Sequence, residues 1–474
     1  MSTQPLTWGA SLLTTALVPR LLGAEALGQF TVAVTLVSLV ATATSLGVSE
    51  FLVRRVAQHP TTVQRDLGVA LLLQTITALL SAIVIGALIP VVAGSLVDPR
   101  LLYIALWGLL FAPAQSILSS AFRGQELHTQ YAWFNAANVI IGQVAGILVL
   151  LAGGDVLGYT ATLTIALIGT TLLGWNLSGL RLSLPSVGGG ALVRAFRELT
   201  WGGFPFLTWS ITLSVTGEID RVLLGLFVPA AEVGWYAAAY RIVAIPLFIP
   251  TLIITPLFPA LSRSVHDPKT IRRMLTRTIR IVLLLMVPLS AGTIVIAPAI
   301  PSLLGWPADF EYAVPLMRLL SLQLPIVAID MVFGVVLMAI GRQGRWVTVG
   351  VVAAALKVLS NFLAIPAFES FSGNGAIGAS LVTLLSETVM VVGAVVLIPK
   401  HMLDPHLVWD MARIGLAGAV TVIVGAALLP HALALSVLGG AAAYVTVAVV
   451  LRALTRDDIQ SLSAQLGRAL PRRP

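Results

Sequence analysis

The chain has 474 residues, of which 58% are hydrophobic and only 10% are charged, and its net charge is +8. Soluble domains carry about 25% charged residues to cover their surface, so this composition excludes an ordinary soluble protein and indicates a chain embedded in lipid. The absence of cysteine excludes disulfides, thiolate metal sites and thiol nucleophiles.

Apolar segments of about 20 residues, the length that crosses a bilayer, follow one another along the whole chain. The first is not followed by a cleavage site, so we expect a retained anchor. We predict an all-α, polytopic membrane fold with fourteen spans. The predicted spans are 5–22, 25–50, 66–94, 100–122, 130–152, 156–180, 198–228, 231–259, 275–303, 312–340, 345–367, 374–398, 408–430 and 433–453.

Basic residues lie mainly on one side of these spans. With the N-terminus inside, 22 of the 28 Lys and Arg residues fall on the cytoplasmic side and two on the opposite side. Cytoplasmic loops of membrane proteins are rich in Lys and Arg, so we expect a prokaryotic plasma (inner) membrane protein with both termini cytoplasmic. The same bias explains the net positive charge, and we expect no nucleic-acid partner.

Two parts of the chain contain the same pair of short motifs in the same order. Leu21-Leu22-Gly23 is followed by Gly28-Gln-Phe30, and Leu223-Leu224-Gly225 is followed by Gly234-Trp-Tyr236. Transporters are often built from such repeats. We therefore predict two pseudo-symmetric six-helix lobes followed by a terminal helix pair with a basic cytoplasmic tail. The predicted parts are 1–185, 186–400 and 401–474.

The most distinctive stretch runs from residue 217 to residue 263. It reads Glu218-Ile-Asp-Arg-Val-Leu-Leu-Gly225, then Gly234-Trp-Tyr236, then Pro256-Leu-Phe-Pro259. This pattern resembles the polysaccharide (O-antigen-type) flippases of the multidrug/oligosaccharidyl-lipid/polysaccharide exporter superfamily. The resemblance extends over nearly the whole chain.

The resemblance implies two helical lobes around a central cavity and alternating access. It implies movement of a polyprenyl-pyrophosphate-linked oligosaccharide from the inner to the outer leaflet for surface polysaccharide or lipopolysaccharide biosynthesis. The expected partners are this substrate, membrane lipids, H⁺ or Na⁺, and a glycan polymerase or glycosyltransferases. Peptidoglycan-precursor flippases and drug–cation antiporters of the same superfamily remain alternatives.

A membrane glycan polymerase or ligase is a further alternative, from a different functional class. The predicted outer loops are short, which speaks against a site that holds a glycan acceptor outside the membrane. The sequence also lacks a phosphate-binding G-x-x-x-x-G-K-[ST] loop, a G-x-S-x-G elbow and metal-ligand spacing of its histidines. We therefore expect a secondary transporter that is not an enzyme and needs no cofactor or metal.

Ionisable residues inside spans cost roughly 2.5–3.5 kcal/mol each on insertion scales, so they usually pair or face a cavity. All eight fall in the predicted second lobe, whereas the first lobe offers mainly neutral groups. The eight are Glu218, Asp220, Arg221, Arg241, Arg318, Asp330, Lys357 and Glu387. The neutral groups are Gln74, Gln115, Asn135, Asn138 and Gln143.

Asp330, Lys357 and Glu387 each lie close to the middle of a span. One interpretation is a structural ion pair of Lys357 with either acid. The other is an ion-coupling site, because two acids and one base leave a net negative charge that suits a proton or a sodium ion.

Glu218 and Arg221 share a helix face and are expected to bridge locally. Asp220 points ~200° away from Glu218 and needs a partner, for which Arg241 is the candidate. Alternatively Arg241 binds the substrate pyrophosphate, whose geometry matches a guanidinium, with Arg20 adding to the site. In peptidoglycan-precursor relatives the position that matches Arg241 is a cavity arginine. The predicted substrate-binding residues are Arg241, Arg20, Asp220 and Asn138.

Overall fold

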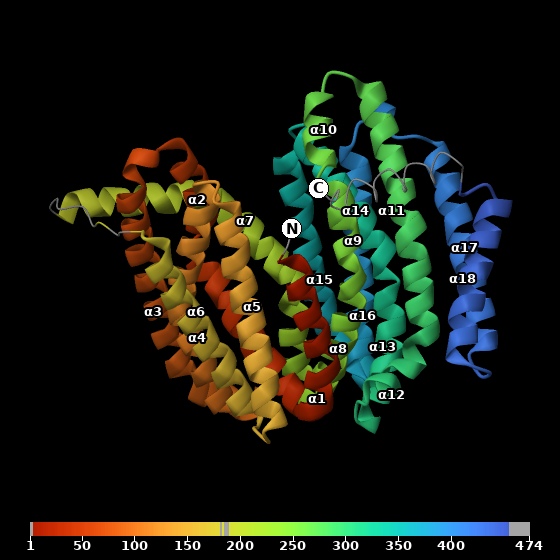
Figure 1. Cartoon of the computed structure of the whole chain (residues 1–474), viewed down its shortest axis with the longest axis horizontal. Coiled ribbons are helices and arrows are strands. Elements are labelled where there is room, and N and C mark those ends of the chain that lie inside the picture. Colours follow the sequence, from red (N-terminus) through yellow and green to blue (C-terminus); the bar gives the residue numbers. More distant parts are fainter. Residues whose placement is uncertain (1–2, 181–182, 184–188, 455–474) are drawn as a thin grey trace, which may run out of the picture. The chain divides into compact units, whose positions relative to one another are not determined.

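The computed structural model describes residues 3–180, 183 and 189–454, and every regular element in these residues is a helix (Figure 1). Contacts divide the chain into two compact units. The N-terminal unit holds Met1–Ala237 with Leu304–Pro307, and the C-terminal unit holds Ala238–Leu303 with Ala308–Pro474. The predicted lobe boundary after residue 185 rests on the sequence repeat and stays a prediction. The basic tail from residue 455 lies outside the described residues.

The N-terminal unit is built from α1 to α7 and the beginning of α8. The bounds are α1 Gln4–Thr44, α2 Val48–Gln58, the 3₁₀ turn Pro60–Thr62, α3 Val63–Leu96, α4 Pro99–Gly124, α5 His128–Leu151, α6 Val156–Ser178, α7 Gly189–Phe227 and α8 Ala230–Ala244.

The C-terminal unit takes the chain from the end of α8 through α18. The α-helices are α9 Phe248–Ile254, α10 Leu257–Arg263, α11 Pro268–Ile296, α12 Ile300–Leu304, α13 Ala313–Ser321, α14 Gln323–Ala339, α15 Gln343–Ser372, α16 Gly375–Leu397, α17 His406–Leu428 and α18 Leu433–Val450. The 3₁₀ turns are Ile245–Leu247, Ala297–Ala299, Ala308–Tyr312 and Lys400–Met402.

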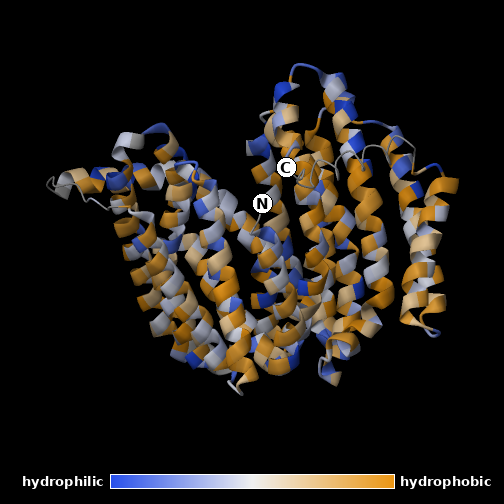
Figure 2. Cartoon of the chain, in the orientation of Figure 1, coloured by the Kyte–Doolittle hydropathy of each residue, from blue (hydrophilic) through white to orange (hydrophobic). Residues whose placement is uncertain are grey.

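The predicted all-α membrane fold is confirmed. Twelve segments within the described residues are long and apolar enough to span a membrane. Counting the two halves of α1 separately and adding α7 accounts for the fourteen predicted spans. α1 is broken at Gly23, whose φ of 76° favours glycine, at the predicted end of the first span. Figure 2 shows hydrophobic residues along most of the helices and hydrophilic residues concentrated in the connections.

Large apolar side chains remain exposed on both units, including Ile165 at 68%, Leu363 at 77% and Val396 at 77%. Soluble monomers do not expose such side chains over most of their helices, because contiguous apolar patches associate in water. This surface is that of a multi-pass membrane protein.

α1 and α8 cross at Gly28 and Gly234, which belong to the two repeated Gly-x-aromatic motifs. A Cβ on Gly28 would lie 1.7 Å from the carbonyl oxygen of Ala230, and a Cβ on Gly234 would lie 2.0 Å from that of Ala24. Small residues let backbones approach closely where helices pack in membranes. Both glycines are therefore required for this contact.

Ion pairs join α11 to α17 and to the connection that precedes α17, within the C-terminal unit. Arg272 lies 3.1 Å from Asp404, and Arg280 lies 3.3 Å from Asp410 on α17. The hydroxyl of Tyr444 on α18 donates to the carbonyl of Leu284 on α11 at 3.1 Å. Helices α17 and α18 are thus part of the C-terminal unit and not a detached appendage.

Candidate substrate cavity

A cavity of about 580 Å³ lies within the N-terminal unit, and six of its helices contribute side chains. Most of the lining residues carry a hydroxyl or amide group, and one acid and one base are among the others. The lining residues are Ala41, Thr42, Thr44, Ser45, Gly47, Ser49, Glu50, Gln74, Ala112, Pro113, Gln115, Ser116, Ser119, Arg123, Asn135, Ser210, Leu213 and Ser214. Three of the neutral polar residues singled out in the sequence, Gln74, Gln115 and Asn135, are brought together here.

The cavity contains a bidentate ion pair. Arg123 near the end of α4 places its two terminal nitrogens 2.7 and 3.3 Å from the carboxylate oxygens of Glu50 on α2. The guanidinium also lies over the ring of Tyr131, 5.8 Å from its centroid. Its Nε is buried and has no acceptor among the residues that the structure describes. Arg123 is therefore a planar cation that Glu50 and Tyr131 fix in position.

Hydrogen bonds between helices fix several of the neutral groups. The hydroxyls of Ser49 on α2 and Ser116 on α4 lie 2.6 Å apart. Gln74 of α3 donates to the Ser45 carbonyl at 3.0 Å and to the Ser49 hydroxyl at 3.1 Å. Such bonds hold the lining in place, so that it presents a fixed set of hydroxyl and amide groups to a ligand.

A line of polar contacts continues from the cavity along α1 and α7. The hydroxyls of Thr42 and Ser214 lie 3.2 Å apart. One turn further along α1, the hydroxyl of Ser38 donates to the carboxylate of Glu218. Glu218 thus has a partner on α1, and its predicted local bridge to Arg221 stays a prediction.

The four predicted substrate-binding residues are not among those that line this cavity. Arg20 is exposed and its guanidinium packs beside the backbone of Gly305, in the short segment that belongs to the N-terminal unit. Asn138 accepts a 3.4 Å hydrogen bond from Thr170 of α6. Arg241 is partly buried on α8, in the C-terminal unit. Their substrate roles stay predictions.

Asp220 is 1% exposed and accepts a hydrogen bond of 3.0 Å from the hydroxyl of Tyr236 on α8. The sequence predicted a partner from another helix, with Arg241 as the candidate, and that pairing stays a prediction. A carboxylate held by a buried hydroxyl is a stable arrangement inside a membrane protein.

The predicted ion-coupling residues lie on three mutually packed helices of the C-terminal unit, Asp330 on α14, Lys357 on α15 and Glu387 on α16. Lys357 is only 1% exposed. The Oδ1 of Asp330 is buried without a hydrogen-bond donor among the described residues. The amide of Asn361, one turn from Lys357, donates to the Lys357 carbonyl at 3.0 Å.

The sequence analysis did not predict Glu50 and Arg123 as site residues. Each lies at the end of a predicted span, where a charged residue is expected to belong to a loop outside the membrane. A signal for Arg123 was present. Ser116, Ser119 and Arg123 recur at the spacing of one helix face on an otherwise apolar segment, which is typical of a helix that faces a polar cavity.

The comparisons with known proteins agree with this architecture. A family profile described as "Polysaccharide biosynthesis protein" matches residues 1–265, more than half of the chain, and the MatE profile matches residues 205–363. The solved structure "Lipid II flippase MurJ, inward closed conformation" is similar with a TM-score of 0.75 at 14% identity, covering 95% of this chain and 98% of that one. At this identity the likeness shows the fold.

Two curated relatives come from Haloferax volcanii. "Probable flippase AglR" is 30% identical over 52% of this chain and 53% of its own length, so the match spans about half of that relative. "Probable low-salt glycan biosynthesis flippase Agl15" is 24% identical over 78% of this chain and 76% of its own length. Because the family profile covers more than half of the sequence, the chain belongs to the polysaccharide biosynthesis protein family.

Proposed function

We propose that this protein is a secondary transporter that flips a polyprenyl-pyrophosphate-linked oligosaccharide from the inner to the outer leaflet of a prokaryotic plasma membrane, for surface polysaccharide biosynthesis. The observation that carries this proposal is the cavity of the N-terminal unit, with its many hydroxyl and amide groups and its single ion pair. The family match and the names of both curated relatives, a flippase and a glycan biosynthesis flippase, support it.

The lining suits a sugar chain attached to a pyrophosphate. Serine, threonine, glutamine and asparagine side chains exchange hydrogen bonds with sugar hydroxyls, and they do so without a charge that would hold the substrate too tightly. Arg123 gives one N–H of each terminal nitrogen to Glu50, and the second hydrogen of each nitrogen is proposed to donate to a phosphate oxygen. Arg241 and Arg20 are proposed to meet the pyrophosphate at other stages of transport, while the polyprenyl tail stays in lipid.

Within this proposal both termini are cytoplasmic. The cavity lies at the end of the unit that carries Arg54, Arg55 and Arg65, which is the predicted cytoplasmic side. It would therefore load from the leaflet in which the lipid-linked sugar is made. A glycan polymerase or glycosyltransferases acting on the same substrate are the proposed partners.

Among the alternatives, a drug–cation antiporter needs an acid that is free to attract a cation. The one acid of this cavity, Glu50, is already paired with Arg123. Among the lining residues no unpaired acid is left to attract a cationic drug. A peptidoglycan-precursor flippase would use the same chemistry with a different sugar, and substrate specificity separates it from the main proposal.

The experiment is reconstitution of the purified protein in sealed vesicles with lipid-linked oligosaccharide extracted from the source cells. A lectin added outside reports the sugar that reaches the outer leaflet, and mass spectrometry reports whether the sugar has changed. We expect protein-dependent exposure of an unchanged substrate. Lengthened or transferred glycans would contradict the proposal and indicate a polymerase or ligase.

Transport is proposed to be coupled to an ion through Asp330 and Glu387. The two acids are half-buried on the packed helices α14 and α16, and both are proposed to take up a proton or a sodium ion during transport. We expect Asp330→Asn to keep the protein in the membrane but to remove the dependence of flipping on an imposed H⁺ or Na⁺ gradient. The measurement is the flipping rate in the same vesicles with and without each gradient. A variant that follows the gradient as the parent does would contradict this role.

A further inference from the structure

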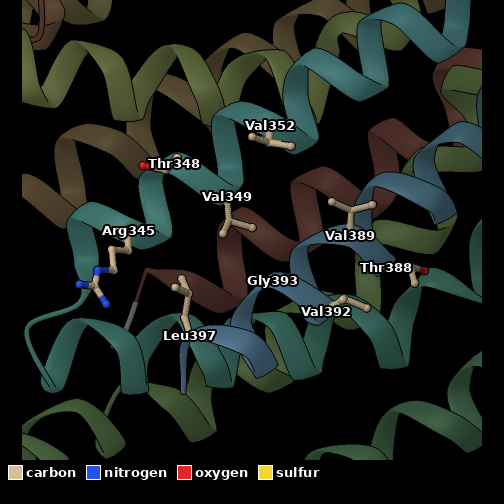
Figure 3. A pocket seen from close by; sticks show the side chains of 9 residues that line it. All are labelled: Arg345, Thr348, Val349, Val352, Thr388, Val389, Val392, Gly393 and Leu397. Carbon is tan, nitrogen blue, oxygen red and sulfur yellow. The ribbon is translucent and has the colours of Figure 1, made fainter. Parts of the chain in front are cut away.

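A second cavity lies on the surface of α15 and α16 in the C-terminal unit (Figure 3). It is a groove of about 530 Å³ that runs along both helices. Figure 3 shows Arg345 at one end of the groove and Thr388 at the other. The groove is lined by Arg345, Thr348, Val349, Val352, Thr388, Val389, Val392, Gly393 and Leu397.

The walls of this groove are apolar, even at Thr348 and Thr388. The hydroxyl of Thr348 donates to the carbonyl of Gly344 at 3.3 Å, and that of Thr388 donates to the carbonyl of Leu384 at 2.7 Å. Each hydroxyl is thus used within its own helix, which leaves little polarity for a ligand. Val352 and Val392 are 55% and 56% exposed. The groove suits a hydrocarbon chain and does not suit a sugar.

Gly393 forms the floor of the groove. A Cβ at this position would lie 2.4 Å from Cγ1 of Val349, so the glycine allows α15 and α16 to approach closely at this point. The hollow is therefore built into the contact between the two helices.

One end of the groove carries an uncompensated positive charge. Arg345 is exposed and makes no ion pair within the part of the chain that the structure describes. Arg342, its neighbour, is already engaged by donating to the carbonyl of Leu397. This end lies on the predicted cytoplasmic side, where the leaflet is rich in anionic lipid.

We propose that this groove is a binding site for an anionic phospholipid of the surrounding membrane. One acyl chain lies along the valines, and the phosphate group contacts Arg345. The charge complementarity selects an anionic headgroup, since basic pockets between membrane helices on the cytoplasmic side bind such headgroups. The acyl chain contributes through close packing against the valines, because it leaves a lipid environment that is already apolar.

The test is lipid retention by the full-length protein in detergent, measured by native mass spectrometry with phosphatidylglycerol and phosphatidylcholine added at equal concentration. We expect one retained phosphatidylglycerol in preference to phosphatidylcholine. Arg345→Ala should weaken this retention about fivefold, the effect of roughly 1 kcal/mol for one basic residue at an anionic surface. Val392→Trp fills the groove without changing its charge and should also weaken retention. Arg263→Ala, which removes an exposed arginine of the same unit outside the groove, should leave it unchanged.

Equal retention of the two phospholipids by the parent protein would overturn the proposal. So would parent-like retention by both Arg345→Ala and Val392→Trp. Displacement of phosphatidylglycerol by polyprenyl phosphate at equal concentration would assign the groove to the carrier lipid and would overturn it as well. Should Arg345→Ala fail to fold, Val392→Trp decides by the same measurement.

Discussion

Arg123→Ala is expected to lower flipping of the lipid-linked sugar about 10- to 100-fold at limiting substrate, while the protein still folds and inserts. The guanidinium is held by Glu50 and Tyr131 in the cavity of the N-terminal unit, and its terminal N–H groups not given to Glu50 are proposed to donate to a phosphate oxygen. Hydrogen bonds to charged groups contribute roughly 1.5–3 kcal/mol, which corresponds to this range of rates. The measurement is the initial rate of lectin-detected exposure in vesicles.

Two control variants separate substrate binding from structure. Arg54→Ala removes an exposed arginine of α2 that does not line the cavity, and it should flip at the parent rate. Glu50→Gln breaks the ion pair but leaves Arg123 in place, so it should retain transport. Equal losses in Glu50→Gln and Arg123→Ala would show that the pair is only structural.

Gly234→Ala is expected to destabilise the protein by about 3 kcal/mol. The new Cβ would overlap the Ala24 carbonyl at 2.0 Å, and this neighbour is backbone that cannot move aside as a flexible side chain would. Gly28→Ala should behave similarly, because its Cβ would meet the carbonyl of Ala230 at 1.7 Å. The measurement is the thermal unfolding midpoint in detergent, followed by the fluorescence of the chain's ten tryptophans.

Gly169→Ala on α6 is the matched control. No atom lies within 4 Å of the added methyl group, and alanine is the better helix former by up to about 1 kcal/mol. This variant should therefore unfold at or above the parent temperature. An unfolding midpoint of Gly234→Ala that equals that of Gly169→Ala would contradict the tight crossing of α1 and α8.

Much of the helical architecture could be predicted from the sequence, because lipid forces every backbone group to be satisfied within its own segment. Long apolar segments therefore have to be helices, and the fourteen predicted spans correspond to helical segments of the structure. The break at Gly23 was also visible, since a Leu-Leu-Gly run followed by a second apolar segment indicates a helix end.

The cavity could not be predicted in the same way. Its lining combines residues as far apart as Ala41 and Ser214, and the hydropathy of each helix does not tell which faces meet. The sequence drew attention to charges in the middle of spans, such as Arg241 and Asp220. The ion pair in the cavity instead uses Glu50 and Arg123 at helix ends, where a charge looks like ordinary membrane anchoring.

In the proposed transport cycle, the polar cavity of the N-terminal unit holds the sugar headgroup. The chain has no cysteine, so a single introduced thiol can be followed alone. Ser210→Cys lines the cavity, and Ser370→Cys is an exposed control in the C-terminal unit. The direct measurement is the rate at which a water-soluble maleimide labels each thiol, with and without lipid-linked oligosaccharide from the source cells. We expect slower labelling of Ser210→Cys alone when the substrate is present, because the bound headgroup covers the cavity. Unchanged labelling of Ser210→Cys, in a variant that still flips the substrate, would contradict it.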